Sequence, residues 1–181
     1  MPMIPVGYMA KRVAARPDWI KAAHVRDICA VSRCISQDFA DYINFWKHNG
    51  WWFFDTPEII KELAAKENID CSGMRFFYYE VYAHEYVEKD KLWRGFKSES
   101  SFETSVHVPL NKELIGFDVV TFSCGSSPEC SPLSCNGLAE EISVNSHCLF
   151  DTFDAAYSSL EAGKFDNSEP GPSRIFAVYI L

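Results

Sequence analysis

The sequence predicts an α+β fold in a single domain over residues 1–181, with a mixed, mostly antiparallel sheet and about three helices packed on it. Long β-rich runs and amphipathic segments follow one another without the regular order of a doubly wound fold. Aromatic residues make up 15 % of the chain and favour a pleated, half-buried surface. No long linker or internal repeat divides the 181 residues, a length near the usual size of one domain.

Three amphipathic segments predict the helices. Apolar side chains recur at i, i+3, i+4 and i+7 in residues 38–48 and 151–163, and in residues 55–69 a buried face is formed by Ile59, Ile60, Leu63 and Ala64. Thr56 can accept a hydrogen bond from the first free amides of the second helix, and Pro57 suits its first turn. Asp151 or Thr152 caps the third helix in the same way.

Five β-rich runs predict the strands. They cover residues 27–35, 74–88, 104–110, 116–123 and 174–181. Residues 74–88 alternate over a long run, whereas 174–181 is nearly all apolar, as in a strand buried on both faces. An exposed edge as apolar as 174–181 would invite aggregation, so we expect this strand to be inserted in the sheet. Residues 51–54 are predicted to be extended.

The charge balance excludes several classes of partner. The chain has 17 basic and 25 acidic residues, for a net charge of −8, and no basic run. A nucleic-acid-binding protein needs clustered Lys and Arg to neutralise phosphates, and an anionic membrane surface makes a similar demand. We therefore expect a protein partner or a small ligand, with no nucleic acid and no membrane.

Cysteine usage and the N-terminus predict a cytoplasmic protein. No apolar run reaches the roughly eighteen residues that a membrane helix requires. The N-terminus has prolines at positions 2 and 5 and lacks the charge order of a signal peptide. Seven cysteines, an odd number, fit a compartment in which thiols stay reduced better than a disulfide scaffold.

Four cysteines late in the chain raise the question of a zinc site. Cys124, Cys130, Cys135 and Cys148 lie in or after a stretch rich in Gly, Ser and Pro. Structural zinc sites usually present a C-x₂₋₄-C knuckle, and only Cys130 and Cys135 approach that spacing. The preferred interpretation is that these thiols are small apolar fillers near turns, with no cofactor. A zinc-stabilised domain is the alternative.

A reactive thiol is a further alternative for the same region. Cys135 precedes a predicted short helix at residues 138–142, whose unpaired amides and dipole would lower the pKa of a thiol. His147 would be the general base, in the Cys/His arrangement of a hydrolase or a transferase. The sequence leaves open whether the protein is an enzyme.

The predicted strand 74–88 carries a strip of polar and aromatic side chains. Glu80, Tyr82 and His84 alternate onto one face, next to Tyr78. In a cleft, such a strip can do acid/base chemistry or bind a cationic or hydrogen-bonding ligand. The simpler interpretation is the solvated face of an antiparallel sheet.

Trp51 and Trp52 are candidates for a binding site. In an extended segment they cannot both point inward, because neighbouring side chains go to opposite faces. Aromatic anchors form the centres of many binding hot spots. The chain also lacks the P-loop, Rossmann, hydrolase-elbow and zincin motifs. The sequence therefore favours an aromatic-rich binding or protein-interaction module over an enzyme.

Overall fold

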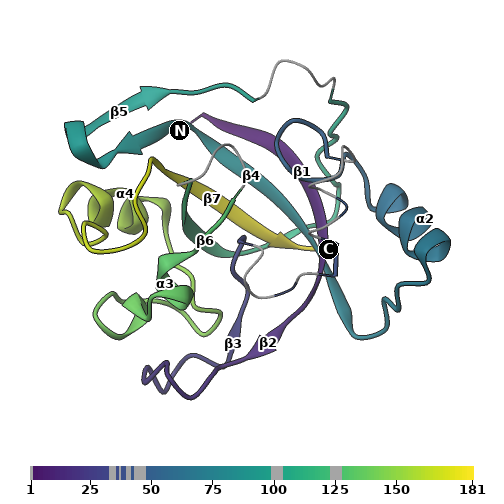
Figure 1. The fold of residues 1–181 in the computed structure, drawn as a ribbon, viewed down its shortest axis with the longest axis horizontal. Helices are drawn as coiled ribbons and strands as arrows, with labels where there is room; N and C mark the ends of the chain where they lie inside the picture. The colour runs from purple at the N-terminus through teal and green to yellow at the C-terminus, as the bar shows by residue number, and fades with distance from the viewer. Residues whose placement is uncertain are drawn as a thin grey trace.

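A five-stranded antiparallel sheet forms the centre of the computed structural model, which describes residues 2–32, 36, 38–39, 42, 48–98, 104–122 and 128–181. The strands are β1 (Met3–Arg12), β4 (Met74–Val87), β5 (Leu92–Gly95), β6 (Glu113–Thr121) and β7 (Ser173–Ile180). Their order is β1-β4-β7-β6, with β5 paired to β4 (Figure 1). Two short strands, β2 (Ala14–Ala15) and β3 (Asp27–Ile28), form a second sheet.

Three α-helices of the described chain pack around the sheet. They are α2 (Pro57–Glu67), α3 (Pro132–Cys135) and α4 (Phe153–Glu161), with 3-10 turns at Glu88–Asp90 and Leu138–Glu140. Helix α2 contacts β1, α3 contacts β6, and α4 contacts β6 and β7. In Figure 1, α2 lies at one end of the view and α3 and α4 lie at the other. These elements confirm the predicted α+β class.

The two predicted helix starts at Thr56 and Thr152 are confirmed. Thr56 Oγ1 accepts a hydrogen bond from the Ile59 amide at 3.3 Å, and Thr152 Oγ1 accepts one from the Ala155 amide at 3.2 Å. Each hydroxyl satisfies an amide that the first turn leaves without an intrahelical partner. The helix predicted over residues 38–48 lies mostly outside the described residues.

The predicted insertion of the C-terminal strand is confirmed. Strand β7 pairs with β4 on one edge and with β6 on the other. Its central residues 175–178 are buried. The runs predicted at 74–88 and 116–123 correspond to β4 and β6.

Three segments differ from the predicted strands. The pattern does not predict β1, whose register shifts between Pro5 and Gly7, where Gly7 adopts a φ of 128°. Within the described residues 27–32 of the predicted strand 27–35, only Asp27–Ile28 is a strand. Residues 104–110 have no regular secondary structure. In these two predicted strands, the described apolar side chains are buried or lie at the surface without strand pairing beyond Ile28.

Both faces of the sheet bury apolar side chains. Along β7, Phe176 and Val178 belong to one hydrophobic cluster, while Ile175 and Ala177 belong to a second. Successive side chains of a strand point to opposite faces, so the two clusters lie on opposite faces of the sheet. The first cluster also contains Cys29. Cys29 therefore packs on the same face as Phe176.

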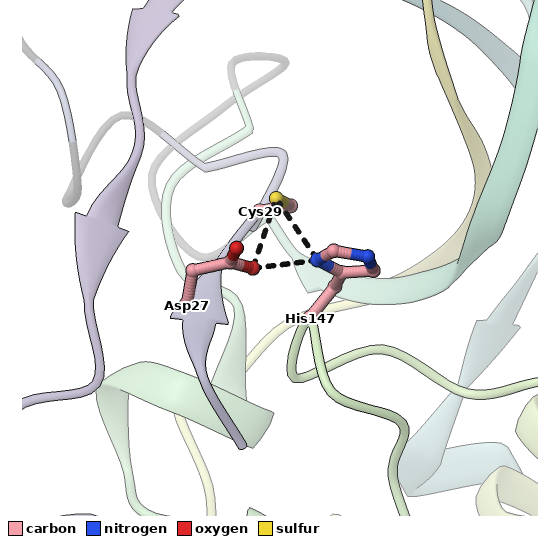
Figure 2. Close-up of side chains that lie close together, drawn as sticks. All are labelled: Asp27, Cys29 and His147. Carbon is pink, nitrogen blue, oxygen red and sulfur yellow. Dashed lines mark hydrogen bonds and ion pairs between the residues drawn. The ribbon is translucent and has the colours of Figure 1, made fainter.

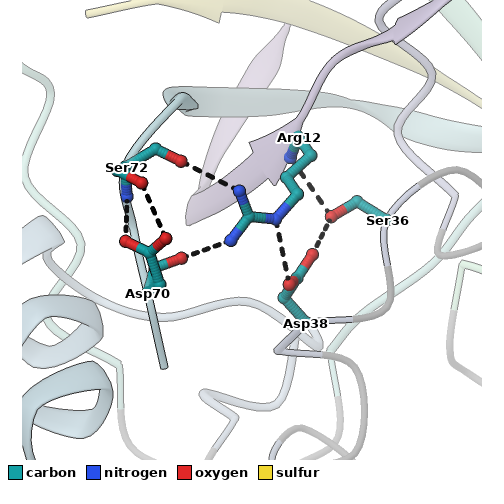
Figure 3. Close-up of polar contacts among 5 residues, drawn as sticks. All are labelled: Arg12, Ser36, Asp38, Asp70 and Ser72. Atoms are coloured by element: carbon teal, nitrogen blue, oxygen red, sulfur yellow. Dashed lines mark hydrogen bonds and ion pairs between the residues drawn. The ribbon is translucent and has the colours of Figure 1, made fainter. Parts of the chain in front are cut away.

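Arg12 holds the end of β1 in place (Figure 3). Its guanidinium donates to the carbonyl oxygens of Ser72, at 2.9 Å, and Asp70. Its Nε lies 3.3 Å from Asp38 Oδ1, and its amide donates to Ser36 Oγ at 3.2 Å. An exposed ion pair of this kind stabilises little. Its contacts fix the point at which the chain leaves β1 toward β2 and β3.

Candidate metal site

Three potential metal ligands, Asp27, Cys29 and His147, lie together (Figure 2). Asp27 Oδ1 is 2.6 Å from His147 Nδ1. Cys29 Sγ is 3.6 Å from the same carboxylate oxygen and 3.9 Å from Nδ1. In Figure 2 the imidazole turns Nδ1 toward the other two side chains, and Nε2 lies on the far side of the ring. Among the described residues, this is the group of three whose ligand atoms all lie within 4.8 Å.

Backbone hydrogen bonds join β3 to the loop that carries His147. The amides of Arg26 and Asp27 donate to the carbonyl oxygen of Ser146, at 2.8 and 3.2 Å. The amide of Cys29 donates to the carbonyl oxygen of His147 at 3.2 Å. Main-chain hydrogen bonds therefore hold the two segments beside each other. The three side chains meet because of these bonds and are not needed to keep the segments together.

Asn145 shapes the loop in front of His147. Its Oδ1 accepts from the amides of His147, at 2.9 Å, and Leu149, at 3.2 Å. Its Nδ2 donates to the carbonyl oxygen of Ile115 in β6 at 2.8 Å. An asparagine that bonds to the amide two residues further on forms an Asx turn. The same side chain thus bends the loop and attaches it to the sheet.

Lys11 and Asp118 hold the segment after Cys29 against the sheet. Lys11 Nζ donates to the carbonyl oxygens of residues 30–32 at 2.7–2.9 Å. Asp118 Oδ2 accepts from the Val31 amide at 2.8 Å and from Ser131 Oγ at 2.6 Å. Both charged side chains are buried. They satisfy backbone groups that would otherwise lack partners in the interior, and they fix the position of Cys29.

The Cys29 thiol is protonated at neutral pH. Burial, followed by the charge of Asp27 and a hydrogen bond to it, raises the pKa of Cys29 to about 12. Burial likewise raises the pKa of Cys148 to about 12, with the charge of Asp118 as the second cause. A protonated thiol is a poor nucleophile. Cys29 is better suited to bind a cation, whose charge favours the thiolate.

The distances between the three ligand atoms fit a zinc ion after one small movement. Tetrahedral zinc, with bonds of about 2.0–2.3 Å, holds its ligand atoms about 3.3–3.8 Å apart. The two distances to Cys29 Sγ, 3.6 and 3.9 Å, are close to that range. The 2.6 Å contact between Asp27 and His147 is a hydrogen-bond distance and has to lengthen. Both side chains are 20 % exposed, so Asp27 can rotate outward without disturbing the core.

Two unpaired polar atoms are buried on the face of the sheet that carries Cys29. Asp118 Oδ1 and Tyr79 Oη have no hydrogen-bond partner within the described part of the chain. Burial raises the pKa of Asp118 to about 7, against the lowering effect of the bonds from Ser131 and Val31. Burial, followed by the nearby Cys29 and Asp118 side chains, raises the pKa of Tyr79. Asp118 can therefore exchange a proton near neutral pH, whereas Tyr79 stays neutral.

The described late cysteines make separate contacts. Cys130 Sγ donates to Asn136 Oδ1 at 3.3 Å. Cys135 Sγ lies 3.9 Å from Ser32 Oγ. Cys148 is buried, with a left-handed backbone at φ 60°. These three cysteines do not belong to the ligand group described above.

Cys135 lies at the C-terminal end of a helix rather than just before an α-helix. It is the last residue of α3, at the end where the helix dipole does not favour a thiolate. The helix predicted after it is a single 3-10 turn, Leu138–Glu140. His147 turns its Nδ1 to Asp27 and Cys29, and its pairing with Cys135 stays a prediction. Cys124 lies outside the described residues, so a zinc site of four late cysteines also stays a prediction.

The polar strip of β4 has two different surroundings. Tyr78 Oη donates to Glu80 Oε1 at 3.1 Å. Tyr82 instead packs against the ring of His84, with centroids 5.2 Å apart, and against the aromatic side chains of α4. The structure thus groups Glu80 with Tyr78 and His84 with Tyr82. The catalytic roles predicted for Glu80 and His84 stay predictions.

Trp51 and Trp52 lie in a turn, so the prediction of an extended segment is wrong. Asn49 Oδ1 accepts from the amides of Trp51 and Phe53, at 3.1 and 3.3 Å, and Trp52 has a φ of 68°. Because the turn breaks the alternation of a strand, both indoles pack against the same core cluster. Trp52 stacks on His48 with ring centroids 4.1 Å apart. Their role in ligand or partner binding stays a prediction.

Sequence reasoning named His147 but not Asp27 or Cys29. The signal that could have identified Asp27 and Cys29 is their spacing in the sequence. Residues i and i+2 of an extended segment share a face, so a carboxylate and a thiol at this spacing can meet one ion. The pattern is too common to be specific, and the position of His147 beside it depends on the fold.

Comparison of the chain with protein families, with curated proteins and with solved structures finds no match. None of the helices within the described residues is long and apolar enough to cross a membrane. The function therefore has to be argued from the chemistry of the site.

Proposed function

We propose that the protein binds a divalent transition-metal ion, preferentially zinc, through Asp27, Cys29 and His147. The observation that carries this proposal is the convergence of a carboxylate oxygen, a thiol and an imidazole nitrogen within 4.8 Å. Mixed oxygen, sulfur and nitrogen ligands suit zinc, whereas calcium and magnesium prefer oxygen ligands alone. The backbone hydrogen bonds of β3 and the Asx turn at Asn145 support the proposal, because they position two of the ligands before a metal ion binds.

The number of ligands favours a functional site over a closed structural one. Structural zinc sites usually have four protein ligands, and catalytic sites have three with an open position for water. A zinc ion in such a site acts as a Lewis acid and lowers the pKa of bound water. A hydrolytic reaction is therefore the enzymatic form of this proposal. A cytoplasmic location suits it, since Cys29 has to stay a free thiol, as it is in the structure.

Cobalt(II) titration tests the site. Cobalt replaces zinc in mixed sulfur and nitrogen sites and gives a thiolate-to-metal absorption band. We expect one cobalt per chain and a band that disappears in Cys29→Ser. Cys71→Ser is the matched control, because Cys71 is a free cysteine outside the ligand group. A band that persists in Cys29→Ser, or that disappears in Cys71→Ser, would place the metal elsewhere.

A second candidate function, protein interaction, is favoured by one exposed segment. Val108 is 50 % exposed, Leu110 is 101 % exposed and Leu114 is 45 % exposed. Contiguous exposed apolar side chains often mark interaction surfaces. Affinity capture from the native host with wild type and Leu110→Ser tests this function, with Leu92→Ser as control because Leu92 is also 45 % exposed. A partner lost only in Leu110→Ser supports it, and a partner retained by all three proteins contradicts it.

A further inference from the structure

Lys112 sits in a cage made of two tyrosine rings and a carboxylate. Its Nζ lies 4.1 Å from the ring centroid of Tyr179 and 4.7 Å from that of Tyr78. The same nitrogen is 2.6 Å from Glu80 Oε1. The side chains of Lys112 and Glu80 are 21 % and 13 % exposed, so the contact is largely shielded from water. Aromatic faces around an ammonium are the arrangement by which proteins recognise alkylammonium groups.

Glu80 holds the walls of the cage together. Its Oε1 accepts from Tyr78 Oη at 3.1 Å, and its Oε2 accepts from Tyr179 Oη at 3.0 Å. Tyr78 and Tyr179 are paired across the central strands β4 and β7. Burial, followed by the charge of Glu80, raises the pKa of Tyr179 to about 12, so this phenol remains a neutral donor. The walls of the cage are therefore held on two neighbouring central strands of the sheet.

The occupant comes from a segment with little secondary structure. Residues 104–112 form neither helix nor strand, and most of them are exposed. The segment is attached through the bond from Tyr8 Oη to the carbonyl of His107, at 2.5 Å, and from the Ser105 amide to Asp55 Oδ2, at 2.9 Å. Segments with few buried contacts open at a low cost in free energy. Lys112 can therefore leave while the cage stays intact.

We propose that Glu80, Tyr78 and Tyr179 form a binding site for an alkylammonium group, and that Lys112 is an internal occupant which this ligand displaces. The ligand class is a primary or methylated amine, either free or as the lysine side chain of a protein. Without Lys112, the partly buried Glu80 carboxylate keeps its two phenol donors but loses its cationic partner, and a bound cation restores that partner. Neutral and anionic ligands do not supply a cationic partner for Glu80. This inference is independent of the metal site.

Lys112→Ala removes the lysine side chain from the cage, and n-butylammonium is then used as the probe for binding in the cage. We expect n-butylammonium to raise the Tm of Lys112→Ala as its concentration rises, because a ligand that binds only the folded state stabilises it. Wild type should bind at least about tenfold more weakly, because Lys112 competes for the cage. n-Butanol, which has the same carbon chain without the charge, should not raise the Tm.

Two further variants control for effects elsewhere on the surface. Lys91→Ala removes a lysine that pairs with Asp166 at 2.6 Å outside the cage, and it should gain no response to n-butylammonium. Adding Tyr179→Leu to Lys112→Ala should abolish the response, because one ring is lost. Lys112→Ser, which also leaves the cage open, replaces Lys112→Ala if that variant does not fold.

Equal responses of wild type and the Lys112 variants, or an equal response to n-butanol, would overturn the proposal. Nα-acetyl-lysine methylamide distinguishes the two sources of the ligand. Binding as tight as that of n-butylammonium supports the cage as a site for a protein lysine. Binding at least about tenfold weaker supports it as a site for a small amine, since the peptide groups then clash with the surroundings of the cage.

Discussion

Asp27 Oδ1 and His147 Nδ1 lie 2.6 Å apart although the two residues are separated by 120 positions in the sequence. The carboxylate only accepts, so the hydrogen of this bond belongs to Nδ1. A metal ion needs the lone pair of Nδ1 and therefore requires this hydrogen to move to Nε2 or to solvent. The bond thus closes the site in the absence of metal, and metal binding replaces it with coordination.

The affinity for metal should rise with pH. Cys29 has its pKa raised to about 12 by burial and by Asp27, so it binds metal only by releasing its proton. One released proton makes the apparent association constant about tenfold higher for each pH unit. Calorimetric zinc titrations at several pH values in the neutral range measure this slope. A flat profile would show that the Cys29 thiol is not a ligand.

Asp118→Asn should remove a pH dependence of stability. The pKa of Asp118 is raised to about 7 from 3.8, chiefly by burial, so the native state binds more protons than the unfolded state between these values. The protonated Asp118 therefore stabilises the native state fully at low pH. This stabilisation, roughly 2–4 kcal/mol in the free energy of unfolding, is lost as the pH rises through about 7. The amide keeps an oxygen for Val31 and Ser131 and does not ionise.

Urea unfolding of wild type and Asp118→Asn at pH 5 and pH 8 measures this difference. Wild type should lose more stability between the two pH values than the variant does. Identical losses would contradict a raised pKa for Asp118.

Lys11→Met should destabilise the protein. Three carbonyl oxygens, of residues 30–32, lose a buried charged donor, and the expected cost is roughly 2–4 kcal/mol. Metal affinity should fall as well, because these bonds hold the segment after Cys29. Lys66→Met is the control, since the Lys66 side chain is 74 % exposed. Denaturant midpoints that shift equally in both variants would argue against a structural role of Lys11.

Gly116→Ala should weaken metal binding without touching a ligand. Gly116 has a φ of 145°, and a Cβ there would lie 2.7 Å from Leu149 Cβ and from the Phe150 carbonyl oxygen. The loop that carries His147 would have to move, at an expected cost of roughly 2 kcal/mol or more. At Gly95 a Cβ meets no atom within 4 Å, so Gly95→Ala is the matched control. Unchanged zinc affinity in Gly116→Ala would show that the loop adapts.

The elements that local signals define were predictable from the sequence. Thr56 and Thr152 cap helices where the pattern places them, and the apolar run at 174–181 becomes the central strand β7. Strand β1 was hidden by Pro5 and Gly7, between which the register shifts. Residues 27–35 look like a buried strand, yet the carbonyl oxygens of residues 30–32 and the Val31 amide are satisfied by Lys11 and Asp118 rather than by a neighbouring strand.

The site was predictable only in part, because it depends on tertiary contacts. His147 was a candidate from its residue type, as the general base for the Cys135 thiol. Its actual neighbours, Asp27 and Cys29, are brought to it by hydrogen bonds between two distant loops, and no spacing in the chain encodes these. The cage around Lys112 similarly joins β4, β7 and the segment before β6. Only its Glu80 and Tyr78 were predicted, as part of a strip able to bind a cation.

The zinc content of the reconstituted protein tests the central claim most directly. The chain is purified without a metal-binding tag, loaded with zinc, freed of excess ion and analysed by native mass spectrometry beside His147→Gln and Asp27→Asn. We expect one zinc per wild-type chain, lost on denaturation, with no zinc in His147→Gln and weakened retention in Asp27→Asn. Equal zinc content in wild type and His147→Gln, or no zinc in wild type, would contradict a metal site at Asp27, Cys29 and His147.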